Sequence, residues 1–149
     1  MSSCDEISIP RLIYRTAQTM TLHAEKALKP YDLTAEQFHL LKNIFENTPL
    51  CQNQLCEIGH KSAANVTRIL DRLEKKGFAK REKNPADRRS TLLFLTAQGK
   101  ELVHEVSSLF ESFTELLTKG IPEQDKAQLT QLLLKVQDNL GTSTKTYQS

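Results

Sequence analysis

Residues 61–95 have the sequence KSAANVTRIL DRLEKKGFAK REKNPADRRS TLLFL. Apolar residues in the first half recur at the i, i+3, i+4, i+7 spacing of one helix face, at Val66, Ile69, Leu70 and Leu73. Gly77 follows, at a place where a glycine commonly ends a helix. The spacing therefore predicts a helix over residues 60–77 with one face buried in a core.

The second half of this stretch predicts a β-hairpin. Residues 78–83 and 91–95 have the length and composition of short strands. They are joined by Asn84-Pro85-Ala86-Asp87-Arg88-Arg89-Ser90, in which Asn-Pro and Asp mark a turn. We expect the helix to be followed by two paired strands with a basic tip.

Two helices are predicted near the N-terminus. Helical spacing of apolar residues runs from about Ser8 to Lys29, and Pro30 stops it. Thr34 and Gln37 have the spacing of a capping box, which predicts the start of a second helix. Residues 47–49, Asn-Thr-Pro, end that helix.

Three further helices complete the prediction. A short one covers residues 50–58 and is closed by Gly59. A long one is capped by Thr96 and continues to Gly120, and the last begins at Pro122. The order is helix, helix, short helix, helix, hairpin, long helix, helix.

The composition agrees with one mainly helical domain. The chain has 149 residues, of which 38% are apolar and 26% charged, with only five Gly and five Pro. No run of about 18 apolar residues occurs, and residues 1–5 lack the pattern of a secretory signal. We expect no membrane segment and a cytoplasmic location.

Positive charge is concentrated in one quarter of the chain. Residues 61–100 contain 11 Lys/Arg and 4 Asp/Glu, a balance of +7, whereas the other residues hold 9 and 14, a balance of −5. A basic segment inside an acidic remainder is typical of a module that binds a polyanion.

Helix, tight turn, helix and basic hairpin together predict a winged helix-turn-helix. Opposite the apolar stripe, the helix over residues 60–77 has a cationic face with small residues at its start: Lys61, Ser62, Ala63, Ala64, Asn65, Arg68, Arg72 and Lys75. Small residues let a helix N-terminus approach base edges, where Asn65 can pair with adenine and Arg68 with guanine.

The hairpin tip predicts a second DNA contact through Asp87, Arg88 and Arg89. An arginine on a narrow turn can enter the minor groove, and a carboxylate two positions before it can hold its guanidinium. The competing interpretations are a solvated amphipathic helix and a winged-helix module that binds protein rather than DNA. The sequence contains no phosphate loop, nucleophile elbow or H-E-x-x-H, so we expect no enzyme.

These residues resemble a known family. The segments that carry the resemblance are residues 70–77 (LDRLEKKG), Arg81, residues 84–89 (NPADRR) and residues 95–99 (LTAQG), with Leu33-Thr34 and Gln37-Phe38 upstream. Together they are similar to the signature of the multiple-antibiotic-resistance regulator (MarR) family. The resemblance implies that Arg89 enters the minor groove with Asp87 as its partner. It also implies that Ser62, Asn65, Thr67 and Arg68 contact the major groove and phosphates.

The resemblance also implies a homodimer that binds a palindromic operator and is released by a small-molecule effector, as a repressor. Residues 1–32 and 97–149 would form the helical dimerisation region, and residues 33–96 the DNA-binding lobe. The apolar stripes of the terminal helices support this division, since one small lobe cannot cover them. An intramolecular bundle is the alternative.

Metal and redox sensing are alternatives to an organic effector. His39 and His104 fall near ligand positions of a zinc-sensing branch of the family, and Glu36, Glu105 or His23 would have to complete the site. Histidines on helices more often serve other roles, so we assign no metal site. Cys51 and Cys56 are interpreted as structural thiols, whereas a pairing of Cys4 across a dimer stays open.

Overall fold

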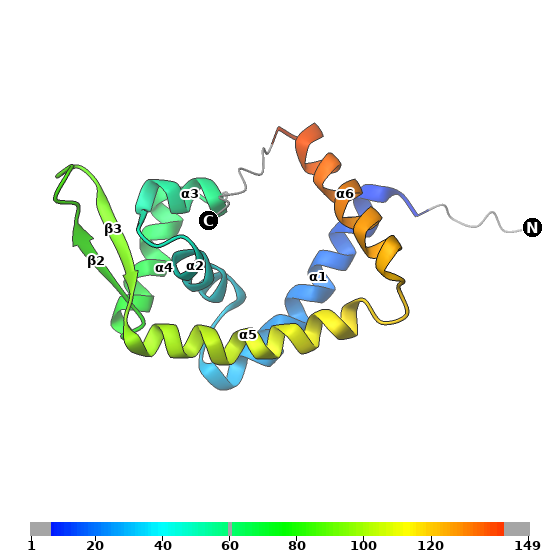
Figure 1. Cartoon of the computed structure of the whole chain (residues 1–149), viewed down its shortest axis with the longest axis horizontal. Helices are drawn as coiled ribbons and strands as arrows, with labels where there is room; N and C mark the ends of the chain where they lie inside the picture. Colours follow the sequence, from blue (N-terminus) through cyan, green and yellow to red (C-terminus); the bar gives the residue numbers. More distant parts are fainter. Residues whose placement is uncertain (1–6, 60, 142–149) are drawn as a thin grey trace, which may run out of the picture.

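The structure, a computed structural model, describes residues 7–59 and 61–141, so Cys4 and the predicted helix start at residue 60 lie outside it. It contains a winged lobe, formed by residues 33–59 and 61–96, and a helical arm, formed by residues 7–32 and 97–141 (Figure 1). The elements, in chain order, are α1 (Ile9–Leu28), η1 (Lys29–Tyr31), α2 (Ala35–Glu46), β1 (Leu50–Cys51), α3 (Gln52–Gly59), α4 (Ala63–Lys75), β2 (Ala79–Lys83), β3 (Thr91–Leu95), α5 (Ala97–Leu117) and α6 (Glu123–Asn139). The predicted mainly helical winged fold is confirmed.

The predicted caps explain where several helices begin and end. The Thr34 hydroxyl accepts from the Gln37 amide at 3.1 Å, and the Gln37 side chain accepts from the Thr34 amide at 3.3 Å, which completes the capping box of α2. Gly77 directly follows Lys76, the C-cap of α4, and has φ of 80°, so it ends the helix in the left-handed region. Gly120, with φ of 78°, lies in the turn after α5, three residues beyond Leu117.

The region around Leu50 was predicted wrongly. Leu50 and Cys51 do not begin a helix but form strand β1, which pairs antiparallel with Leu93 and Leu92 of β3. The sheet therefore has three strands in the order β1-β3-β2 rather than a lone hairpin. Pairing with a strand some 40 residues away buries Leu50 in the core, and no local pattern encodes such a contact.

Other helix ends differ from prediction by a few residues. Ser62 is the N-cap of α4, so this helix starts at Ala63 and ends before Gly77. At the end of α1 the chain tightens into the 3₁₀ turn η1, which contains Pro30. Gly59 is the last residue of α3 and does not adopt a left-handed conformation.

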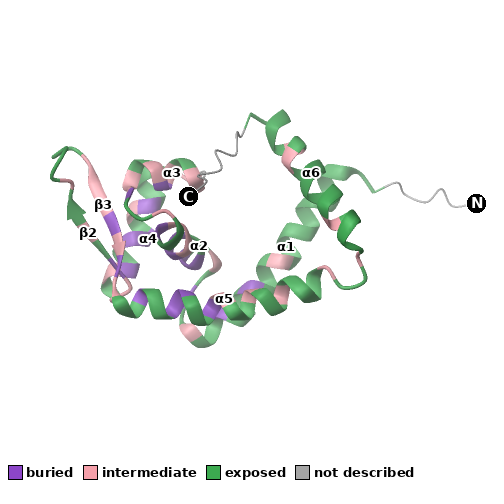
Figure 2. Cartoon of the chain, in the orientation of Figure 1, coloured by how far each residue is buried: buried purple, intermediate pink, exposed green. Residues whose placement is uncertain are grey.

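The core lies in the winged lobe (Figure 2). The predicted stripe Val66, Ile69, Leu70 and Leu73 of α4 is buried there, against side chains of α2, α3, β3 and the first half of α5. Phe38 of α2 stacks on Phe110 of α5 with ring centroids 4.8 Å apart. By contrast, α6 and most of α1 are exposed (Figure 2). No helix among residues 7–59 and 61–141 has the length and hydropathy needed to cross a bilayer.

Strands β2 and β3 and the turn between them form the wing. The base of the wing and the start of α5 are in close contact. The Thr96 hydroxyl donates to the Gly77 carbonyl at 2.7 Å and accepts from the Gly99 amide at 3.0 Å. The Thr96 amide donates to the Phe78 carbonyl at 3.1 Å. Gly99 lies against that same carbonyl: a Cβ built on it would be 2.0 Å from the Phe78 oxygen. The start of α5 can therefore approach the base of the wing only with glycine at position 99.

Gly99→Ala should lower the free energy of unfolding by more than about 2 kcal/mol, because the added methyl overlaps backbone that cannot rotate away. Gly59→Ala is the matched control. A Cβ there meets only the flexible Lys61 side chain, at 3.9 Å, and alanine favours the helix. Urea denaturation of both variants checks the expectation; equal stability of the two would contradict the close contact.

Candidate nucleic-acid interface

The start of α4 presents a flat, exposed surface. Ser62, Ala63, Ala64 and Asn65 are all exposed. The Ser62 side chain accepts from the Asn65 amide at 3.2 Å, which caps the helix and holds this first turn in place. A helix N-terminus with no bulky side chain can enter the major groove deeply enough to reach base edges.

Asn65 and Arg68, the two predicted base-contacting residues, are in contact with each other. Arg68 Nη2 donates to Asn65 Oδ1 at 3.0 Å across one helix turn. Both side chains are exposed, and this bond does not use the Asn65 amide nitrogen or the other guanidinium nitrogens of Arg68, which are donors. The pair is thereby preorganised as a set of donors beside a flat helix end.

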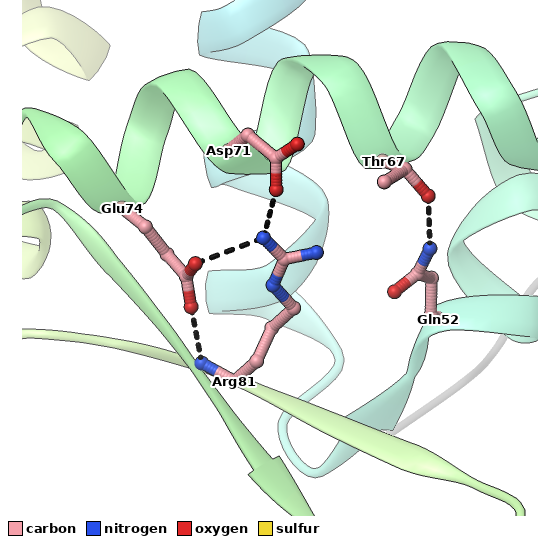
Figure 3. A network of polar contacts seen from close by, with 5 residues as sticks. All are labelled: Gln52, Thr67, Asp71, Glu74 and Arg81. Atoms are coloured by element: carbon pink, nitrogen blue, oxygen red, sulfur yellow. Dashed lines mark hydrogen bonds and ion pairs between the residues drawn. The ribbon is translucent and has the colours of Figure 1, made fainter.

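The remaining predicted DNA-contacting residues of α4 and the residue before it differ in exposure and in whether they already have a partner in the protein. Arg72 and Lys75 are exposed. Lys61 pairs with Glu36 at 2.9 Å, and this hydrogen bond lowers the pKa of the Glu36 carboxyl. Thr67 is half-buried and its hydroxyl accepts from Gln52 Nε2 at 2.8 Å, which ties α4 to α3 (Figure 3).

The tip of the wing is closed by backbone contacts. The Asn84 amide donates to the Ser90 carbonyl at 3.1 Å, and the Ser90 amide donates to the Asp87 carbonyl at 3.0 Å. Asp87 Oδ1 accepts from the backbone amide of Arg89 at 3.0 Å. Asp87 is thus in contact with Arg89, but through the Arg89 backbone amide and not through the guanidinium, which was the predicted contact. Arg88 and Arg89 are exposed on this turn.

An ionic cluster that we call the wing anchor joins β2 to α4. It consists of Arg81, Asp71 and Glu74 (Figure 3). Arg81 Nη2 donates to Glu74 Oε2 at 2.9 Å and also pairs with Asp71, while the Arg81 backbone amide donates to Glu74 Oε1 at 3.0 Å. These bonds lower the pKa of the Glu74 carboxyl and raise the pKa of Arg81. The wing is therefore held at a fixed angle to α4.

Sequence reasoning assigned no function to the wing anchor. Arg81 was noted only as part of the family resemblance, although Asp71 and Glu74 are spaced i, i+3 on α4 and so share one helix side. That spacing, followed by a basic strand, is a local signal from which the contact could have been predicted. The partners of Thr67 and Lys61, on other helices, had no such local signal.

The structure does not bring the candidate metal ligands together. Within the described residues, no group of three His, Cys, Asp or Glu side chains is placed to hold a metal ion. His23 packs near Phe113, His104 lies edge-on to Phe45, and Glu36 is engaged by Lys61. Cys51 and Cys56 are half-buried free thiols, and desolvation raises the pKa of Cys56, which disfavours a reactive thiolate.

A cavity of about 350 Å³ lies between α1, α2 and α5. Its lining is mostly apolar and includes Met20, Phe110 and Phe113, with His39 as a polar group. His39 is exposed in the single chain, yet partial desolvation lowers its pKa, which favours the neutral imidazole. The cavity is bounded both by the helical arm and by the winged lobe.

The sequence was compared with known proteins. The model of the MarR family matches residues 33–91, which cover α2 to the start of β3. An uncharacterized HTH-type transcriptional regulator of Bacillus subtilis, YwaE, is 30% identical over 140 residues, which cover 93% of this chain and 82% of that protein. The multiple antibiotic resistance protein MarR of Escherichia coli is 32% identical, over 87% of this chain and 91% of that protein.

Solved structures agree. The crystal structure of an E. coli MarR cysteine-to-serine mutant in complex with operator DNA matches with a TM-score of 0.80 and 32% identity, over 91% of this chain and 99% of that one. A complex of S. aureus MepR with DNA matches with a TM-score of 0.84 and 25% identity, with the same coverage of both chains. Near-complete coverage, the winged fold and the exposed basic face lead to one conclusion: the chain belongs to the MarR family of DNA-binding transcriptional regulators.

Proposed function

We propose that the protein is a repressor that binds a palindromic operator as a homodimer and is released by a small organic effector. The observation that supports DNA binding most directly is the flat, exposed N-terminus of α4, with Asn65 and Arg68 preorganised beside it. The wing anchor holds a second basic element, the wing, at a fixed angle to that helix. Two rigidly linked contacts suit the two grooves of one duplex. The protein would act in the cytoplasm.

Each residue of this interface has a proposed role. Ser62 and Ala63 allow close approach to the major groove, where Asn65 meets adenine and Arg68 meets guanine. Arg89 enters the minor groove, with Asp87 shaping the turn behind it. The remaining residues would contact phosphates: Lys61, Thr67, Arg72, Lys75 and Arg88.

The dimer proposal is supported by α6, in which no residue is buried in the single chain. Its apolar stripe is largely open to solvent, with Leu132 at 54% and Leu140 at 77% exposure. A helix of this kind gains its stability from packing, so a partner must cover the stripe. α1 and the far half of α5 also expose apolar residues, including Leu12 and Leu116. Residues 1–32 and 97–149 would thus dimerise and residues 33–96 bind DNA.

Release by an effector is supported by the cavity between α1, α2 and α5. Its aromatic and apolar lining suits a small, partly apolar organic molecule, with His39 as its polar contact. Because α2 belongs to the winged lobe and α1 and α5 belong to the helical arm, a ligand in this cavity would contact both parts. It would change the spacing of the two lobes and so favour dissociation from the operator.

Arg89→Ala should weaken operator binding at least tenfold, because a minor-groove contact is lost at each half-site, and leave the thermal midpoint unchanged, since Arg89 is exposed. Lys119→Ala, an equal loss of charge at the far end of α5, is the control. Fluorescence anisotropy with labelled operator measures both; equal affinity of the two variants would remove Arg89 from the interface.

Glu74→Ala tests whether the wing anchor positions the wing. Removal of a negative charge near DNA would by simple electrostatics tighten binding, whereas loss of the anchor should weaken operator binding several-fold. Glu46→Ala, an exposed carboxylate on α2, is the matched control. The measurement is the operator affinity of both variants, at a temperature well below their unfolding temperature. Tighter binding by Glu74→Ala would show that the anchor has no positioning role.

Leu132→Asp should give folded monomers, because this side chain is exposed in the single chain and contributes only to the proposed dimer contact. Operator affinity should fall at least a hundredfold with the loss of one half-site. Gln131→Asp, on the opposite face of α6, should stay dimeric. Sedimentation equilibrium reports the assembly state, and a dimeric Leu132→Asp protein would place the interface elsewhere.

A further inference from the structure

A second cavity, of about 730 Å³, lies where α1, η1, α2 and the end of α4 meet, and we call it the junction cavity. Four basic side chains line it from two directions: Lys26 and Lys29 from α1 and η1, and Arg72 and Lys76 from the end of α4. It shares no lining residue with the apolar cavity between α1, α2 and α5.

The junction cavity has an excess of positive charge that is not internally paired. Its lining also contains Glu25 and Asp32, which leaves two net positive charges. Asp32 lies 3.4 Å from Lys76, but its own side chain is 95% exposed. Among residues 7–59 and 61–141, no carboxylate lies within ion-pair distance of Lys26, Lys29 or Arg72. Three cationic groups are therefore available to a ligand.

Gln37 adds a hydrogen-bond donor to the lining of this cavity, and its amide nitrogen is not fully enclosed by protein. Gln37 is only 4% exposed and lines the cavity. Its Oε1 accepts from the Thr34 amide and from Lys76 Nζ, each at 3.3 Å. Since both partners are donors, the orientation of the amide is fixed and the remaining atom is the NH₂ group. The part of the chain that the structure describes offers that NH₂ group no hydrogen-bond acceptor.

We infer that the junction cavity binds an oxyanion group, in a ligand with at least two negative charges. One anionic group would meet Lys26 and Lys29, the other would meet Arg72, and the Gln37 NH₂ group would donate to an anionic oxygen. The N-terminus of α2, capped at Thr34, adds a favourable field for negative charge. The volume is that of a small-ligand site.

The same chemistry has two sources, a free small polyanion or the phosphates of a DNA backbone. Arg72 lies in the junction cavity and is also one of the proposed phosphate contacts. If that assignment holds, a free polyanion in the cavity draws Arg72 away from DNA, and its binding and DNA binding oppose each other.

Sodium pyrophosphate is the probe, titrated calorimetrically into the DNA-free protein at constant ionic strength. The wild-type protein should bind it saturably. Lys26→Ala/Lys29→Ala should bind at least tenfold more weakly, whereas Lys119→Ala, which removes a lysine at the far end of α5, should bind as the wild type does. This measurement needs no operator, so its result is independent of the proposed regulatory function.

Gln37→Glu tests the oxyanion site more directly than the lysine variants do. Glutamate at this position retains the acceptor that completes the capping box, so the fold should be kept, as circular dichroism and thermal unfolding will show. The change replaces the free NH₂ donor with a negative charge, so pyrophosphate binding should fall at least tenfold. Unchanged binding by a folded Gln37→Glu protein would overturn the assignment.

A salt titration separates the two sources. If the ligand is DNA phosphate, the DNA-free protein will not bind pyrophosphate, but Lys29→Ala will lower the slope of log K against log salt by about one relative to Lys119→Ala. That result would support the oxyanion site with DNA as its source. If pyrophosphate does not bind and the slopes agree, the junction cavity is not an oxyanion site.

Discussion

The geometry of the proposed DNA-binding surface depends on the wing anchor. A two-stranded ribbon that projects from a small lobe has little stability or fixed direction of its own. Arg81 stabilises the ribbon and fixes its direction. Two carboxylates of α4 accept hydrogen bonds from its guanidinium, and one of them also accepts from its backbone amide. The Arg81 side chain is only 23% exposed, so these charge-assisted bonds are better shielded from water than a surface ion pair. Arg89 can therefore be placed relative to Asn65 without any contact between the two.

Polar contacts of the same kind fix α4 on its other sides. Thr67 is bonded to Gln52 of α3, and Lys76, the C-cap of α4, contacts Gln37 of α2. The apolar stripe faces the core. The remaining side of α4, which includes Arg68, is exposed. The helix thus presents its basic face because every other side already has a partner, and few side chains need to be ordered when DNA binds.

Local signals predicted most of the fold. The capping box at Thr34 and the left-handed Gly77 depend on a few neighbouring residues, and both were found as expected. β1 was missed because Leu50 acquires its strand conformation from pairing with Leu93. The hydrogen bond from the Arg89 amide to the Asp87 side chain was not predicted either, because it forms within the folded turn. In the candidate site, the helical spacing predicted which side of α4 is exposed, whereas the contacts that hold each residue depended on tertiary neighbours.

The distribution of burial limits how the proposed effector could act on the protein. The winged lobe has its own core and stacks Phe38 of α2 on Phe110 of α5, whereas α6 has no buried residue in the single chain. The lobe is thus a packed unit attached to an arm whose apolar faces are largely exposed in the single chain. A molecule that enters between Phe110 and α1 meets less resistance in the arm than in the lobe core, since packed cores deform little. Movement of whole lobes about α5, rather than distortion of α4, is the change that this architecture allows.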